Sequence, residues 1–195
     1  MFPITRLSRF AAPAFVALTL ALGPQIGAAE TALDLQAPVV AADLSKSKQT
    51  TPGLYITAAD AGRVIADHPN MALIDVRTPS ETMLIGYPTQ AAANIPSKFV
   101  DPALGFDAQK GVYKMIDNPD FVAEVQAWLA SDAAQGIDTI LVMCRSGSRS
   151  AAAIEKLVKA GLDVTLYNVV DGFEGDKNDA CLLYTSDAAD EYQRV

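Results

Sequence analysis

The chain has 195 residues, half of them hydrophobic, which is enough for one α/β domain with an appendage at each end and excludes a wholly disordered chain. Its 23 acidic and 15 basic residues give a net charge of −8. An acidic chain without a basic run is a poor partner for nucleic acid or an anionic membrane, so an anionic substrate would need a local cluster of positive charge.

Residues 1–29 have the pattern of a secretory signal peptide. Arg6 and Arg9 form a positive segment, residues 10–22 form an apolar run, and residues 27–29 are the small residues that precede a cleavage site. The alternative is a membrane anchor, but the run is shorter than the span of about 20 residues that a bilayer needs. We therefore expect a periplasmic protein with no membrane attachment after cleavage. Losing two basic residues and no acidic one changes the net charge from −8 to −10.

The remaining chain divides into three parts. Residues 30–53 show no sustained period and predict a linker. Residues 54–180 alternate between apolar runs and helical patterns, and this alternation predicts one α/β domain with an open parallel sheet and helices on both faces. The expected elements are a helix from the Thr57 cap to Ala66, a strand over 71–76, an extended piece at 94–96, a helix from Asn118 to Leu129, a strand over 138–143, a helix over 150–160 and a strand over 164–170.

One loop carries the residues that point to chemistry. Cys144 directly follows the expected strand 138–143, at the carboxyl end where ligands bind in such sheets. A turn of this kind lets consecutive backbone amides face inward and bind an anion, and the next helix adds its positive end. We predict that Cys144 is a nucleophilic thiolate at neutral pH, because helix N-termini and neighbouring cations lower thiol pKa values. A buried structural cysteine is the alternative, but two flanking arginines are unusual around one.

The rest of the loop is expected to bind the substrate. Arg145 is the preferred contact for an anion, and Arg149 either does the same or pairs with a carboxylate such as Asp75 or Glu81. The single histidine, His68, lies in an expected surface turn, so neither a Cys–His dyad nor a metal site is predicted. The full set of expected substrate-binding residues is Arg145, Ser146, Gly147, Ser148, Arg149 and Ser150.

Four motifs in order resemble the rhodanese family. They are CRSGSRS at 144–150, ALIDVRTPSE at 72–81, ANIP at 93–96 and VDGF at 170–173, the last with Asp171 where glycine is usual. The resemblance covers about residues 54–177 and departs at 86–91, GYPTQA, which leaves the pocket rim undefined. It implies a rhodanese-like fold and a thiosulfate sulfurtransferase that carries sulfur as a Cys144 persulfide. The donor would be thiosulfate or a persulfide, the acceptor a thiol or a protein, and no cofactor would be needed.

Two other functions remain open. Phosphatases and arsenate reductases of related fold place five residues between cysteine and arginine, whereas four separate Cys144 from Arg149 here, which predicts a smaller cradle. A sulfur carrier or redox-sensing module without turnover would keep the same cysteine.

The last 15 residues, 181–195, do not resemble the rest of the domain. The run CLLYTSDAADE at 181–191 resembles a translated sequencing adaptor, and a divergent native tail is the alternative. The final helix that rhodanese domains usually have would then be missing, and Cys181 would not be native. We therefore do not predict a disulfide between Cys144 and Cys181, although an even number of cysteines in an exported chain permits one.

Overall fold

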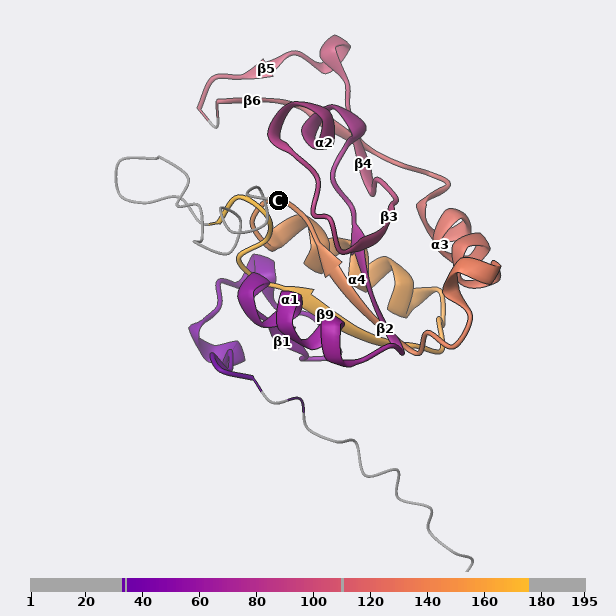
Figure 1. Ribbon diagram of the computed structural model, residues 1–195. Coiled ribbons are helices and arrows are strands. Elements are labelled where there is room, and N and C mark those ends of the chain that lie inside the picture. Colours follow the sequence, from indigo (N-terminus) through magenta and orange to yellow (C-terminus); the bar gives the residue numbers. More distant parts are fainter. Residues whose placement is uncertain (1–32, 34, 110, 176–195) are drawn as a thin grey trace, which may run out of the picture. The chain divides into compact units, whose positions relative to one another are not determined.

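A computed structural model describes residues 33, 35–109 and 111–175. The chain divides into two compact units, Met1–Ala32 and Leu33–Val195, and all described residues belong to the second. Five strands form one sheet in the order β1-β9-β8-β2-β3, in which every neighbouring pair is parallel (Figure 1). These strands are β1 (Tyr55–Ile56), β2 (Met71–Asp75), β3 (Ala91–Asn94), β8 (Thr139–Met143) and β9 (Thr165–Val169).

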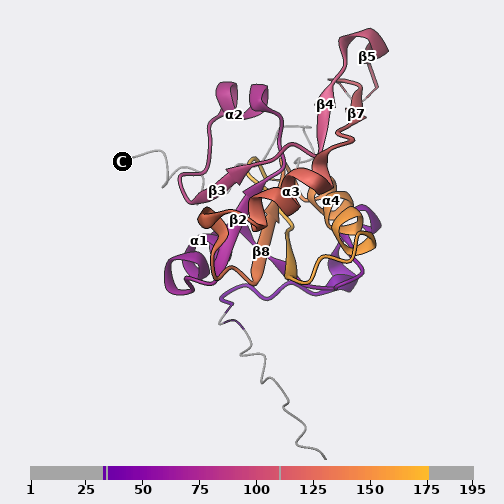
Figure 2. The same ribbon diagram turned by 90° about the vertical axis from the view of Figure 1, so that its right-hand side faces the viewer.

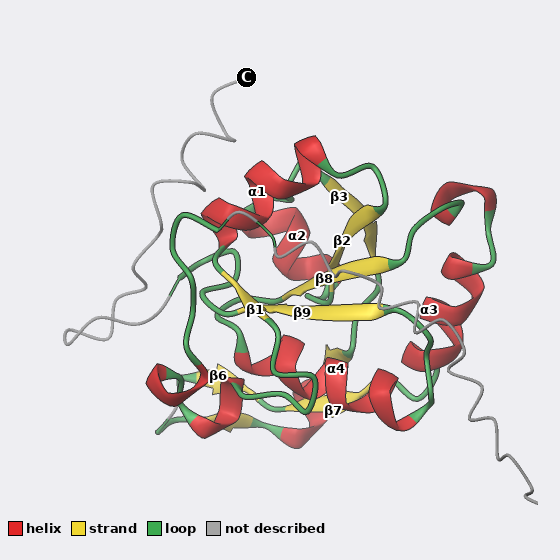
Figure 3. Ribbon diagram, turned by 90° about the horizontal axis from the view of Figure 1, so that it is seen from below, coloured by secondary structure: helices red, strands yellow, loops and turns green. Residues whose placement is uncertain are grey.

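Helices cover both faces of the sheet, as the sequence predicts (Figure 3). Helix α1 (Ala58–Asp67) packs on one face, and α3 (Phe121–Leu129) and α4 (Ser148–Lys159) pack on the other. The central strand β8 is buried along its length because its side chains alternate between the two cores. Ile140 and Val142 join the α3–α4 side, while Leu141 and Met143 join the α1 side. The predicted α/β class with an open parallel sheet is confirmed.

The predicted helix starts are accurate to within a few residues. The Thr57 hydroxyl caps α1 by accepting from the Asp60 N–H at 3.1 Å. Asp60 does not complete a capping box, because its carboxylate accepts from the backbone N–H groups of Gln36 and Ala37 instead. Helix α3 begins later than predicted, since Asn118 caps a preceding turn by accepting from the Asp120 N–H. The expected extended piece at 94–96 is mostly outside β3, which ends at Asn94.

Helix α4 begins two residues earlier than predicted, at Ser148 instead of Ser150. Its N-cap is Gly147, which adopts a left-handed conformation with φ of 90°. The helix therefore starts immediately after the loop turns, and the first part of the CRSGSRS segment is loop while the second part is helix. This shorter loop brings the helix N-terminus closer to Cys144.

Besides the short strand β1 and the 3-10 turns, two larger structures were not predicted. The first is helix α2 (Pro79–Ile85), which starts with a full capping box between Thr78 and Glu81. The second is an antiparallel arm, residues 98–117 apart from residue 110, which extends away from the parallel sheet (Figures 1 and 2). The arm contains β4 (Lys98–Val100) paired with β7 (Met115–Asp117), the 3-10 turn η3 (Pro102–Leu104), and β5 (Phe106–Asp107) paired with β6 (Val112–Tyr113).

The residues before Leu54 were predicted to be a linker over 30–53. Those that the structure describes, 33 and 35–53, are instead part of the domain. They form two 3-10 turns, η1 (Ala41–Asp43) and η2 (Lys46–Lys48). Asn168 on β9 donates to the Lys48 carbonyl at 2.9 Å, and Thr51 donates to the Glu155 carboxylate on α4 from both its N–H and its hydroxyl. A further 3-10 turn, η4 (Asp132–Ala134), follows α3.

The expected signal peptide (1–29) and the suspected tail (181–195, with Cys181) lie outside the described residues. Within the described part of the chain, no helix has both the length and the apolar character needed to cross a bilayer.

Candidate active site

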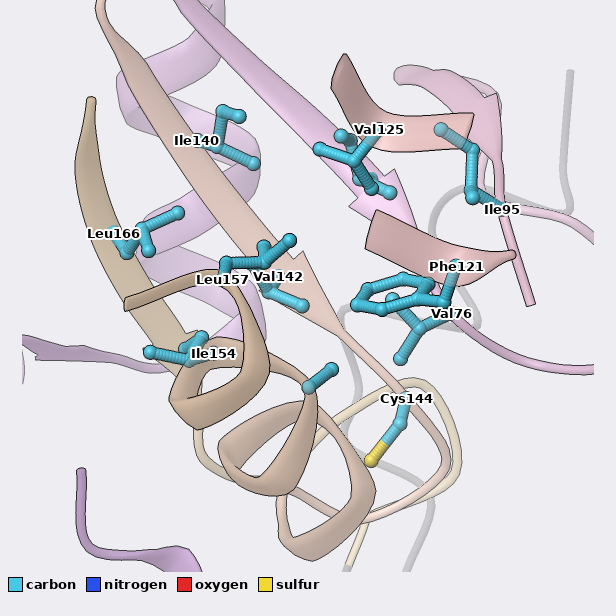
Figure 4. Close-up of a cluster of buried hydrophobic side chains, with 12 residues drawn as sticks. Val76, Ile95, Phe121, Val125, Ile140, Val142, Cys144, Ile154, Leu157 and Leu166 are labelled. Atoms are coloured by element: carbon cyan, nitrogen blue, oxygen red, sulfur yellow. The ribbon is translucent and has the colours of Figure 1, made fainter. Parts of the chain in front are cut away.

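The sulfur of Cys144 lies just beyond the end of β8, at the edge of the α3–α4 core. Figure 4 shows it past the strand, near Val76 and Phe121, with the sulfur directed toward the first turns of α4. The residue is 1% exposed, and two groups are placed to donate to its Sγ: the Gly147 N–H at 3.2 Å and the Ser150 hydroxyl at 3.4 Å. Both donors belong to the N-terminal end of α4, so this end of the helix faces the sulfur.

Gly147 is the position on which this loop depends. A Cβ added there would lie 2.1 Å from the Val170 carbonyl oxygen, and its φ of 90° is one that other residues rarely adopt. The first helical hydrogen bond of α4 runs from the Ala151 N–H to the Gly147 carbonyl. The N–H groups of Ser148, Arg149 and Ser150 therefore have no earlier helical carbonyl to bind, and remain as donors at the positive end of the helix.

The turn after β9 holds the loop from behind. Its amides donate to the loop carbonyls, Phe173 to Cys144 and Glu174 to Arg145, both at 2.9 Å. Gly172 makes this close approach possible, because a Cβ there would lie 2.5 Å from the Arg145 carbonyl oxygen. The turn that contains the VDGF motif at 170–173 thus supports the backbone of Cys144 and Arg145.

The structure decides between the two roles that the sequence left open for Arg149. Its guanidinium binds both carboxylate oxygens of Glu81 on α2, with each N–O distance at 2.7 Å. Burial disfavours the charge of Glu81, but the hydrogen bonds and charge of Arg149 outweigh it and lower the pKa of Glu81 from 4.5 to about 2. Burial likewise opposes the charge of Arg149, yet Glu81, and to a lesser extent Cys144 and Asp75, raise its pKa above the ordinary value.

This ion pair predicts a pH dependence of stability. Because the folded pKa of Glu81 is lowered from 4.5 to about 2, its stabilisation is complete above pH 4.5 and is lost as the pH falls toward 2. We expect Glu81→Gln to lower the free energy of unfolding by about 1–2 kcal/mol at neutral pH and by less as the pH approaches the folded pKa. Urea titrations at several pH values measure this difference.

The matched control is Asp132→Asn, which neutralises an exposed carboxylate at the start of η4. It should change the unfolding free energy little at any of these pH values. A deficit in Glu81→Gln that stays constant down to acidic pH would contradict the prediction.

Arg145 lines a pocket together with Cys144 and Arg149. A pocket of about 650 Å³ lies between the loop and the arm. Of the predicted site residues, five line it together (Cys144, Arg145, Ser146, Ser148 and Arg149), whereas Gly147 and Ser150 contact the sulfur from behind. Two lysines of the arm, Lys98 and Lys114, also line the pocket. The pocket lining thus holds four cations, these lysines and the two arginines, and one carboxylate, Asp107.

Ser150 and Asn168 form a buried polar network beneath the loop. The Ser150 hydroxyl lies 2.6 Å from Asn168 Oδ1, 3.0 Å from the Gly147 carbonyl and 3.4 Å from the Cys144 sulfur, and its single hydrogen serves one acceptor at a time. Asn168 Nδ2 in turn donates to the Gly147 carbonyl at 3.1 Å. The network thus links β9 to both the turn glycine and the sulfur.

A second buried pair supports the region below α2. The guanidinium of Arg77 binds the Asp75 carboxylate through Nε and Nη2 and also donates to the Gly86 carbonyl at 2.9 Å. The ring of Phe173 lies over this guanidinium, 4.0 Å from its central carbon. Asp75 and Arg77 therefore organise local structure and join β2 to the turn that holds the loop.

Several site residues were missed by sequence reasoning. The sequence around Lys98 and Lys114 does not indicate a binding site, because the arm that brings these lysines to the pocket was not predicted. Asn168 was missed because it lies within an ordinary apolar strand pattern. Glu174 directly follows the VDGF motif; it is 5% exposed, and burial raises the pKa of its carboxyl. Among the described residues, no group of three or more His, Cys, Asp or Glu side chains is placed to hold a metal ion.

Comparison with known proteins identifies no family. No protein-family profile matches the chain, and no curated protein matches it. Among solved structures, the chain is similar to the crystal structure of Rv0390 from M. tuberculosis, with 26% sequence identity over 66% of this chain and 85% of that chain and a TM-score of 0.42.

Proposed function

We propose that this protein is an exported, rhodanese-type sulfurtransferase that moves sulfane sulfur from thiosulfate or a persulfide to a thiophilic acceptor through a persulfide on Cys144. The observation that supports this most directly is the environment of the sulfur. Cys144 Sγ is placed to receive hydrogen bonds from the Gly147 N–H and the Ser150 hydroxyl, and it lines a pocket shared with Arg145 and Arg149. Such surroundings stabilise an anionic nucleophile and attract an anionic donor.

The first half-reaction follows from this arrangement. The Cys144 thiolate attacks the outer sulfur of thiosulfate, the S–S bond of thiosulfate breaks, and its electron pair leaves with sulfite. The outer sulfur stays bound to Cys144 as a persulfide anion, so charge and electrons balance without an external oxidant. The loop N–H groups that the start of α4 leaves without helical partners would stabilise the new terminal sulfur.

In the second half-reaction an acceptor nucleophile takes the terminal sulfur. The acceptor attacks that sulfur, the persulfide bond breaks, and its electron pair returns to Cys144 Sγ. Two half-reactions that share one covalent intermediate constitute ping-pong catalysis.

The pairing of Arg149 favours sulfur transfer over phosphate chemistry. A phosphatase cradle needs its arginine to bind the phosphate in a bidentate manner, whereas both nitrogens of Arg149 that face Glu81 are already used by that carboxylate. Arg145, which lines the same pocket, is the better candidate for contact with a small anion such as thiosulfate.

The test is mass spectrometry of the mature chain after treatment with thiosulfate. We expect a gain of one sulfur atom on the peptide that contains Cys144, and its removal on addition of cyanide with formation of thiocyanate. Cys144→Ser, treated in parallel, should gain nothing. Sulfur found on Cys181 alone, or an unmodified Cys144, would contradict the proposal. Loading of Cys144 without repeated turnover would favour the carrier function instead.

A further inference from the structure

The recess around Cys144 restricts how an acceptor can reach it. The residue is 1% exposed, so a reacting thiol must enter the pocket, and the wall opposite the loop is formed by the arm. Residues from β6, β7 and η3 line this wall. The pocket is larger than an ion such as thiosulfate requires, and its volume of about 650 Å³ is in the range that receives a peptide-sized group.

The arm keeps apolar side chains in water beside this opening. We call the following set the apolar rim: Leu104, Phe106, Val112, Tyr113 and Met115. Leu104 is 45% exposed, Phe106 55% and Tyr113 52%, and the last two rings contact each other edge to face with centroids 5.3 Å apart. All members except Phe106 line the Cys144 pocket directly. An exposed apolar group of this kind, rich in aromatic side chains and continuous with a reactive site, is typical of a protein-binding surface.

The charge next to the apolar rim has the sign opposite to that of the chain. Lys114 lies between Tyr113 and Met115 in sequence and lines the pocket together with Arg145. The chain as a whole carries a net charge of −8, whereas among the residues that line the pocket the cations outnumber the one carboxylate, Asp107. Lys98, the other lysine of the pocket, is bound to Asp117 at 2.8 Å and is less available to a partner. A partner that carries acidic residues next to its thiol would therefore be attracted here and repelled elsewhere.

We propose that the apolar rim and Lys114 form the docking surface for a protein acceptor that presents a cysteine on a protruding segment with both apolar and acidic neighbours. This inference rests on the proposed sulfurtransferase function. The incoming thiolate attacks the terminal sulfur of the Cys144 persulfide, a new S–S bond forms on the acceptor, and the electron pair of the broken bond returns to Cys144. The arm selects the acceptor, and the loop performs the chemistry.

Three peptide acceptors and cyanide test the inference. The probes are acetyl-Asp-Leu-Cys-Phe-Asp-amide, its Lys-Leu-Cys-Phe-Lys counterpart and an Asp-Gly-Cys-Gly-Asp peptide. With thiosulfate as donor, we expect kcat/KM for the acidic apolar peptide to exceed that for either other peptide by about tenfold. Flanking lysines lower a thiol's pKa and acidic residues raise it, so the thiolate fraction near neutral pH gives the acidic peptide no advantage.

Variants assign the preference to the arm. Phe106→Ser should lower the ratio of peptide to cyanide kcat/KM by about tenfold, since Phe106 is outside the pocket wall and contacts only a larger acceptor. Val40→Ser removes an equally exposed apolar side chain, 58% exposed, before η1, and should leave the ratio unchanged. Lys114→Glu should make kcat/KM for the basic apolar peptide higher than that for the acidic one. A misfolded protein cannot produce such a gain in activity toward the basic peptide.

The outcomes separate this inference from the proposed function. Absence of any thiosulfate–cyanide turnover would refute both. Normal cyanide turnover with equal kcat/KM for all peptides, or with a ratio that Phe106→Ser does not change, would refute the docking surface alone. Sedimentation of the wild type as a dimer that Phe106→Ser dissociates would identify a second copy of the chain as the occupant and would also refute it.

Discussion

Replacement of Cys144 by alanine is expected to lower kcat/KM for thiosulfate, with cyanide as acceptor, by at least about a thousandfold. In the proposed mechanism the Cys144 sulfur is both the nucleophile and the carrier, so no covalent intermediate would form without it. Alanine keeps the backbone hydrogen bond from the Phe173 N–H to the carbonyl of residue 144, and the residue whose side chain it shortens is only 1% exposed. The measurement is steady-state formation of thiocyanate, with circular dichroism to establish that the variant is folded.

Two controls make this prediction specific. Cys144→Ser keeps a hydroxyl at the site of the sulfur and should be as inactive as the alanine variant, because a serine hydroxyl near neutral pH is neither anionic nor able to carry sulfur. Cys181→Ser removes the other cysteine of the chain and should leave turnover at the wild-type level. Retained activity in Cys144→Ala would overturn the assignment of the nucleophile and, with it, the proposed function.

The second large effect is expected on stability, from the pair formed by Asp75 and Arg77. Both side chains are 0% exposed, and their closest approach is 2.8 Å between Arg77 Nη2 and Asp75 Oδ2. Asp75→Asn keeps the shape but leaves the Arg77 charge buried without a counter-ion, which should cost about 3–5 kcal/mol of unfolding free energy. One guanidinium nitrogen, Nη1, already lacks a hydrogen-bond partner among the described residues, so little compensation is at hand.

A double-mutant cycle provides the control for this prediction. Arg77→Met alone leaves the Asp75 carboxylate unpaired, and the double variant Asp75→Asn/Arg77→Met removes both charges. We expect the double variant to lose less unfolding free energy than the two single variants together, by about 2 kcal/mol or more. Urea denaturation measures all four proteins. Strictly additive effects, or a cost of Asp75→Asn below about 1 kcal/mol, would show that the pair does not act as a buried unit.

Much of the site could be inferred from local sequence because its parts are local. Cys144 follows an apolar run and precedes a helical pattern, and one stretch of chain therefore contains the strand end, the turn and the helix start. The sequence could not decide whether Arg149 of this loop pairs with Asp75 or with Glu81, or binds the substrate instead. The distance from Glu81 to Arg149 is 68 residues along the chain, and no local pattern specifies which carboxylate a long side chain reaches.

Two elements were missed for different reasons. Helix α2 carries a capping signal, TPSE at 78–81, but it is short and none of its residues is fully buried, so it lacks the apolar period on which helix prediction relies. The arm consists of strands of two or three residues whose apolar side chains are largely exposed. Such strands do not alternate between a buried and a solvated face, and this alternation is the usual signal of an antiparallel strand.

The sequence by itself determined the α/β class with a parallel sheet, the main buried strands along the chain and the position of Cys144 at the carboxyl end of one of them, because apolar period, turn residues and spacing are properties of neighbouring residues. Only the tertiary structure decided that Glu81 binds Arg149, that residues before Leu54 pack on α4 and β9, and that the arm forms the far wall of the pocket. Those contacts join segments far apart in the chain, and they form through packing and charge pairing that exist only once the sheet is assembled.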